Sequence, residues 1–181
     1  MLLARAQSPC LSDRIGAKTI GVRIESSNPF HVLMRIPVPW VFQLVFLIGT
    51  GVQFLLPAAL RPNATNEVRI GGVIVLVAGV LLAAWSLLIF RKERTTTVPG
   101  ETSRTLVVRG PYRFTRNPMY VSLTLVYLGE AGVIGQLGPV FLLPLVLAYI
   151  NWVVIPVEES KLSDAFGATY HSYRARVRRW I

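Results

Sequence analysis

Cysteine is almost absent from this sequence of 181 residues, in which Cys10 stands alone. A single cysteine cannot form a disulfide within the chain, and it cannot supply the several thiolates of a cysteine-built metal site. We therefore expect neither an internal disulfide nor a metal centre.

Charged residues are also scarce, at 15% against 52% hydrophobic residues, a composition too apolar for an ordinary soluble domain of this size. Basic residues still outnumber acidic ones by 19 to 9, which gives a formal net charge of +10. A nucleic-acid binder gathers such residues on one water-exposed face, whereas here they lie between apolar runs. The composition favours a membrane protein of one domain and not a nucleic-acid partner.

Three long stretches lack charge almost completely. Residues 36–60 and 70–90 carry none, and each is long enough for a helix of about 20 residues that crosses the hydrocarbon. Residues 117–157 carry only Glu130 and have three glycines and Pro139 near their middle, so this stretch is expected to fold back on itself. We predict an all-α integral membrane protein with two helical hairpins, whose four transmembrane helices cover residues 38–60, 70–90, 118–134 and 139–157.

The basic residues predict the orientation of these spans. Five precede the first span, seven lie between the second and third, and five follow the fourth, whereas only Arg61 and Arg69 fall on the other side. Because positive charge is retained in the cytosol, both termini and the loop 91–117 are expected to be cytosolic.

Residues 1–35 mix Arg5, Arg14, Lys18 and Arg23 with polar residues and contain no apolar run long enough for a signal peptide. We expect an unstructured extension here, with an organelle-targeting segment as the alternative, and place the membrane domain at residues 36–181.

The loop before the third span ends in alternating arginine and aromatic residues, from Arg109 to Tyr120. Asn117 followed by Pro118 indicates a helix N-cap and first helical position, so free backbone N–H groups should point to the cytosolic surface. Beside Arg113 and Arg116, this helix end suits a carboxylate or phosphate. The alternative is that these arginines only bind acidic lipid headgroups.

Two adjacent carboxylates, Glu158 and Glu159, stand directly after the fourth predicted span. Ionisable groups at the edge of the hydrocarbon are normally paired or functional. The alternative is simple exit of the helix into water beside Lys161. Pro156 lacks an N–H and should kink or open the helix just before the two acids.

Apolar and aromatic residues recur every three or four positions after the fourth span, and arginines follow them. This pattern predicts an amphipathic helix over about residues 160–178 that lies in the membrane interface. Its stripe of Phe166, Tyr170 and Tyr173 should face the same surface as the two glutamates. Together the three segments offer positive and negative groups beside aromatic surface, a combination that suits a zwitterionic ligand.

The same residues carry a family resemblance. Gly-Pro-Tyr-Arg-Phe-Thr-Arg-Asn-Pro-Met-Tyr at 110–120, the Glu158-Glu159 pair, and Phe166-Gly167 with Tyr170 and Tyr173 resemble the membrane methyltransferases typified by isoprenylcysteine carboxyl methyltransferase, with phospholipid methyltransferases as relatives. The resemblance covers residues 109–181. Asn117 and Ser122 stand where the isoprenylcysteine enzymes usually have His and Gly.

The resemblance implies S-adenosylmethionine as the methyl donor and a lipophilic or amphiphilic acceptor at the cytosolic membrane face, either an isoprenylcysteine-type carboxylate or a phospholipid amine. We expect the donor to be bound by Gly110, Tyr112, Arg113, Arg116, Asn117, Pro118, Tyr120, Glu158 and Glu159. We expect the catalytic residues to be Glu159, Tyr120 and Arg174.

Two other interpretations remain open on the sequence. Sterol-reductase-type membrane enzymes have a similar C-terminal motif set and use NADPH, although they have many more spans than four. A non-catalytic membrane scaffold or sensor with the same fold is the second. The sequence leaves the oligomeric state undecided, and Gly71, Gly72 and Gly79 would permit close helix contact in a dimer.

Overall fold

The computed structural model describes residues 37–55, 64–92 and 106–181. In these ranges the chain is helical and has no β-strand, which confirms the predicted all-α class. The elements in order are α2 (Val38–Leu55), α3 (Asn66–Lys92), the short 3-10 helix η2 (Gly110–Arg113), α4 (Pro118–Ile134), α5 (Gly138–Tyr149), the π-helical turn η3 (Ile150–Val154) and α6 (Ile155–Arg176). The predicted extension 1–35 and residues 56–60 of the first span lie outside the described residues.

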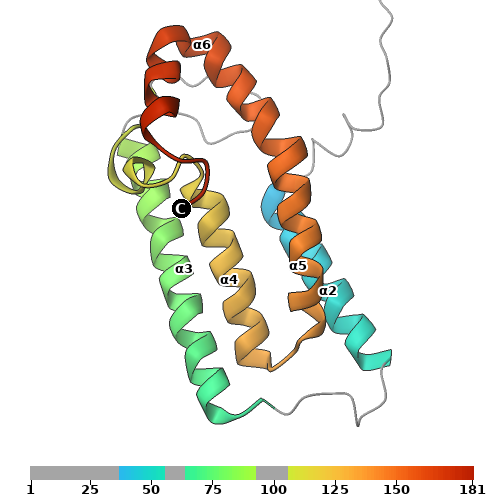
Figure 1. Cartoon of the computed structure of the whole chain (residues 1–181). Coiled ribbons are helices and arrows are strands. Elements are labelled where there is room, and N and C mark those ends of the chain that lie inside the picture. The colour runs from blue at the N-terminus through green and yellow to red at the C-terminus, as the bar shows by residue number, and fades with distance from the viewer. Residues whose placement is uncertain (1–36, 56–63, 93–105) are drawn as a thin grey trace, which may run out of the picture.

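The helices form two adjacent pairs, with α3 beside α4 and α2 beside α5 (Figure 1). The last part of α6 turns back over the end of the bundle at which α4 begins, as Figure 1 shows. We call this end the site end, because the predicted functional residues lie there.

Glycines allow α3 and α4 to approach closely. A Cβ atom on Gly72 would lie 2.6 Å from the backbone nitrogen of Val133, and one on Gly79 would lie 2.8 Å from that of Val126. Small residues at such positions let helix backbones pack directly in a membrane. Gly72 and Gly79 are therefore used within one chain, whereas Gly71 has nothing within 4 Å and remains open to other contacts.

The pair α2 and α5 is joined by a buried polar contact. The Oε1 atom of Gln53 in α2 accepts a hydrogen bond of 2.7 Å from the backbone N–H of Gly138, at the start of α5. The first N–H groups of a helix have no partner within the helix, and in an apolar environment an unpaired one is costly. Gln53 thus satisfies the start of α5 from a neighbouring helix.

Tyr127 of α4 connects the two pairs. Its ring stands edge-on to the rings of Phe42 and Phe46 of α2, at centroid distances of 5.9 and 5.2 Å. Its hydroxyl donates a hydrogen bond of 2.8 Å to the backbone oxygen of Pro139 in α5. The centre of the bundle is therefore aromatic, with its polar atom satisfied.

The last helical stretch extends from Gly138 to Arg176 and contains a kink at Gly167. Pro156 cannot donate to a carbonyl one turn earlier, and the turn before it is π-helical, with the Ile155 N–H bonded to the Ile150 oxygen. The predicted opening at Pro156 is therefore accommodated as a π-turn. At Gly167 the backbone leaves helical geometry, with φ 49° and ψ −124°, and the chain reverses direction.

The predicted interfacial helix 160–178 is thus not a separate element, because its first part continues the fourth span up to Gly167. Three helical stretches are long and apolar enough to cross a membrane, namely Val38–Leu55, Asn66–Lys92 and Gly138–Arg176. The predicted third span coincides with α4, whose 17 residues are at the lower limit for crossing. The chain is a multi-pass membrane protein, and the count of four spans stays a prediction.

Gly72→Val is expected to lower the free energy of unfolding by about 1–3 kcal/mol, because the added side chain would force the backbones of α3 and α4 apart. The matched control is Gly71→Val, whose side chain would enter open space. Chemical denaturation in detergent micelles measures both variants. Equal effects of the two substitutions would contradict the close α3–α4 packing.

Candidate functional site

Residues 106–117, the described part of the connection between α3 and α4, include η2 and lie at the site end. Gly110 has φ 60°, and a Cβ atom there would collide with the side chain of Ile89. The buried ring of Tyr112 stands edge-on to Phe90 at 5.2 Å, and its backbone oxygen accepts a hydrogen bond of 2.8 Å from the hydroxyl of Tyr173. Burial raises the pKa of the Tyr112 phenol above its usual range, so it stays protonated at neutral pH. The 3-10 helix η2 is thereby fixed between α3 and α6.

Glu159 lies at the centre of an ion cluster that we call the triad, formed by Arg116, Glu159 and Arg179. Its Oε1 atom is 2.8 Å from Nη1 of Arg116, and its Oε2 atom is 2.8 Å from Nη2 of Arg179. Nε of Arg179 also donates to Oε1 at 3.2 Å. The side chains of Glu159 and Arg116 are only 10% and 11% exposed. Two guanidinium groups and one carboxylate leave this buried cluster with a net charge of +1.

Glu158 uses a different partner. The hydroxyl of Tyr120 donates to Oε1 of Glu158 at 2.6 Å. A hydrogen bond to a carboxylate is short and strong, and this one joins the first turn of α4 to α6. The adjacent acids therefore have distinct environments, since Glu159 is held by two cations and Glu158 by a neutral phenol.

Residues 177–181, which we call the C-terminal segment, run beside the start of α4. The backbone N–H of Arg116 donates to the oxygen of Arg178 at 2.9 Å. The backbone oxygen of Arg179 accepts two further hydrogen bonds of 3.0 Å, from Oγ1 of Thr115 and Nδ2 of Asn117. Asn117 occupies the predicted N-cap position, but its side chain does not cap the helix and binds the C-terminal segment instead.

The structure brings most of the predicted site residues to the site end. A cluster linked by these hydrogen bonds contains Arg116, Asn117, Tyr120, Glu158 and Glu159, with Pro118 buried at the start of α4. Gly110 and Tyr112 lie next to it in η2. Arg113 and Arg174 are exposed, and the structure does not place them in this cluster.

Sequence reasoning missed three residues of the site, Asn151, Arg179 and Trp180. Oδ1 of Asn151 in η3 accepts hydrogen bonds from Nε1 of Trp180 at 3.1 Å and from Nη1 of Arg179 at 3.4 Å. The available signal was Asn151 itself, a lone amide in the fourth predicted span. Arg179 belongs to a run of arginines that is also typical of a membrane anchor, so its pairing with Glu159 had no local signature.

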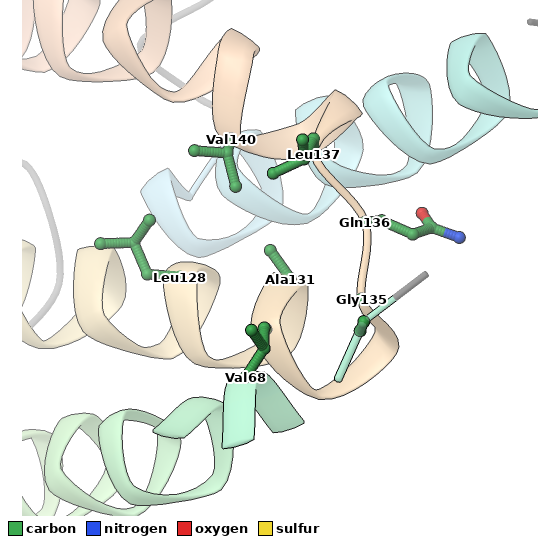
Figure 2. A pocket seen from close by; sticks show the side chains of 9 residues that line it. Val68, Leu128, Ala131, Gly135, Gln136, Leu137 and Val140 are labelled. Carbon is green, nitrogen blue, oxygen red and sulfur yellow. The ribbon is translucent and has the colours of Figure 1, made fainter. Parts of the chain in front are cut away.

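A separate hollow lies at the opposite end of the bundle, between α3, α4 and α5 (Figure 2). It has a volume of about 270 Å³ and is lined mainly by apolar residues, among them Val68, Leu128 and Val140. By the rise of α4, Ala131 in its wall is about 16 Å along the helix axis from Tyr120 in the first turn. This hollow therefore has no part in the charged site.

The charges of the site end are arranged for a ligand with both signs. Nε of Arg116 is buried and has no hydrogen-bond partner among the described residues, so it can donate to an anion. Glu158 offers negative charge one residue from the centre of the triad. A zwitterion with a carboxylate and an ammonium group would find complementary partners here.

The fold and these residues define a multi-pass membrane protein with a polar site at one end of its helices. Residues 68–169, more than half of the chain, match the family model of phospholipid methyltransferase. The chain belongs to this family, which confirms the resemblance drawn from its motifs and implies methyl transfer to a lipid-type substrate. No curated protein and no solved structure matches the sequence.

Proposed function

We propose that the protein transfers a methyl group from S-adenosylmethionine to a phospholipid amine or an isoprenylcysteine-type carboxylate at the cytosolic membrane face. The observation that carries this proposal is the pairing of opposite charges at the site end. Arg116, Tyr120, Glu158 and Glu159 meet there, and all four lie within the residues that match the family.

The residues present fit this donor. The free Nε of Arg116, together with Asn117 and the start of α4, would bind its carboxylate. Glu158 and Glu159 would bind its ammonium group and ribose. We assign Gly110, Tyr112, Arg113 and Pro118 to the walls of the same site.

When bound, S-adenosylmethionine supplies a methyl group on a positively charged sulfur. Transfer breaks one S–C bond and forms one C–N or C–O bond, and the sulfur is left as a neutral thioether. A carboxylate acceptor releases no proton. An ammonium acceptor must lose one proton before its nitrogen lone pair can attack the methyl group, and Glu158 is the carboxylate placed to receive it.

Alignment and exclusion of water are the main contributions of the protein to this reaction. Holding two reactants in register can supply about 7–11 kcal/mol of the barrier. Glu159 would act by fixing Arg116, Tyr120 would line the reaction chamber, and Arg174 would stand at its entrance. An acceptor lipid would enter laterally between the helices with its polar group at the site end.

Glu158→Ala is expected to weaken binding of S-adenosylmethionine by about 10- to 100-fold, because a hydrogen bond to a charged group contributes about 1.5–3 kcal/mol. Equilibrium dialysis with protein purified in detergent measures the affinity. Asp164→Ala, an exposed acid on the same helix, is the matched control and should bind as the wild type does.

A wild-type protein that binds NADPH and not S-adenosylmethionine would instead support a sterol-reductase-type enzyme. Donor binding without methyl transfer to any lipid would support a scaffold or sensor.

A further inference from the structure

The C-terminal segment is bonded to the same groups that the proposed donor site offers. Arg179 occupies Glu159 through its side chain, and its backbone oxygen occupies the amide of Asn117. The oxygen of Arg178 occupies the backbone N–H of Arg116. The side chain of Arg179 thus occupies the carboxylate of the site, and the backbone oxygens of the segment occupy the hydrogen-bond donors beside the start of α4.

Most of the hydrogen-bonding capacity of the Glu159 carboxylate is used in this state. A carboxylate accepts about four hydrogen bonds, and three are made by the two arginines. Its side chain is only 10% exposed. An ammonium group can therefore bind Glu159 only after one guanidinium leaves it.

Arg179 is the partner that can leave. Its side chain is 29% exposed, whereas that of Arg116 is 11% exposed. Arg116 is also fixed directly before α4, whereas the C-terminal segment is held there by hydrogen bonds to Thr115, Asn117 and Asn151, which break when the segment leaves. Residues 177–181 also lie beyond residues 68–169, the part of the chain that matches the family.

We propose that the C-terminal segment is an intramolecular competitor of the methyl donor, in which the Arg179 guanidinium stands in for the donor's ammonium group on Glu159. Donor binding then requires Arg179 to leave the triad. This inference rests on the proposed function, since it takes Glu159 and Asn117 as donor-binding residues.

Removing an internal competitor raises the fraction of molecules that can bind, and the apparent affinity rises in proportion. A chain that ends after Val177 is expected to bind S-adenosylmethionine about tenfold more tightly than the full chain. This magnitude corresponds to a segment that fills the site in roughly nine of ten molecules. Arg179→Ala should show a smaller gain in the same direction. Arg176→Ala, which removes an exposed arginine before the segment, should leave the affinity unchanged.

Hydrogen exchange on the full-length protein gives a readout that does not depend on the variants folding. Addition of S-adenosylmethionine should speed exchange of the amides of residues 177–181. Slower exchange there, or weaker binding by a folded truncated chain, would show that the segment is a wall of the site and would overturn the competition. Absence of binding in every variant and in the wild type would overturn the proposed function itself.

Discussion

Replacement of Glu159 with alanine is expected to lower the free energy of unfolding by about 3–5 kcal/mol and to abolish measurable methyl transfer. The reason is that the substitution leaves two guanidinium groups near each other with no counter-charge, and removal of one partner from a buried ion pair carries a cost of this size. Arg116 is almost buried, so solvent cannot replace the carboxylate.

Chemical denaturation in detergent gives the stability, and transfer of a labelled methyl group gives the activity. Glu159→Gln keeps the shape of the side chain and removes only its charge. This variant should be more stable than Glu159→Ala, but it cannot form the ion pairs with Arg116 and Arg179. Asp164→Ala should change neither quantity. A fully stable Glu159→Ala protein would mean that the triad does not hold α4 and α6 together.

Arg116→Ala is expected to reduce methyl transfer by at least about 100-fold. This change removes the buried Nε atom proposed to bind the donor carboxylate, and it also removes one of the cations of Glu159. Loss of two charge-assisted hydrogen bonds of about 1.5–3 kcal/mol each accounts for the magnitude.

Arg116→Lys separates the two contributions. Lysine keeps a positive charge for Glu159 but has no counterpart of Nε, so this variant should fold and still show a raised KM for S-adenosylmethionine. Initial rates over a range of donor concentrations measure both parameters. Wild-type KM in Arg116→Lys would exclude Nε from donor binding.

The helices were predictable from the sequence because charge marks their ends. The third predicted span has the same bounds as α4, since Arg116 precedes it and glycines follow it. The fourth was predicted to end near Val157, but the helix continues to the kink at Gly167. The apolar pattern ends at Glu158, Glu159 and Lys161, but the helix does not end there, because all three residues are good helix formers.

The pairing of the two acids was only half predictable. Their position at the end of an apolar stretch indicated that they are paired or functional. Their partners lie far away in sequence, since Arg116 is 43 residues before Glu159 and Arg179 is 20 residues after it. Helical periodicity carries no information on contacts of this kind.

The role of the C-terminal segment was not predictable for a related reason. The contact of Arg179 with Glu159 depends on the reversal at Gly167, and a glycine in a helical pattern does not reveal which way the chain turns. The same reversal explains why Asn117, predicted to cap α4, instead donates to the backbone of Arg179.

Methyl transfer into lipid is the most direct test of the proposed function. Wild-type protein in vesicles that contain phospholipids with free amine headgroups and an isoprenylcysteine analogue is incubated with S-adenosylmethionine labelled in its methyl group, and the lipids are then extracted and separated. We predict label in one of these two lipid classes with wild type and none with Arg116→Ala. Label in neither class, although the wild-type protein is folded and supplied with donor, would contradict the account.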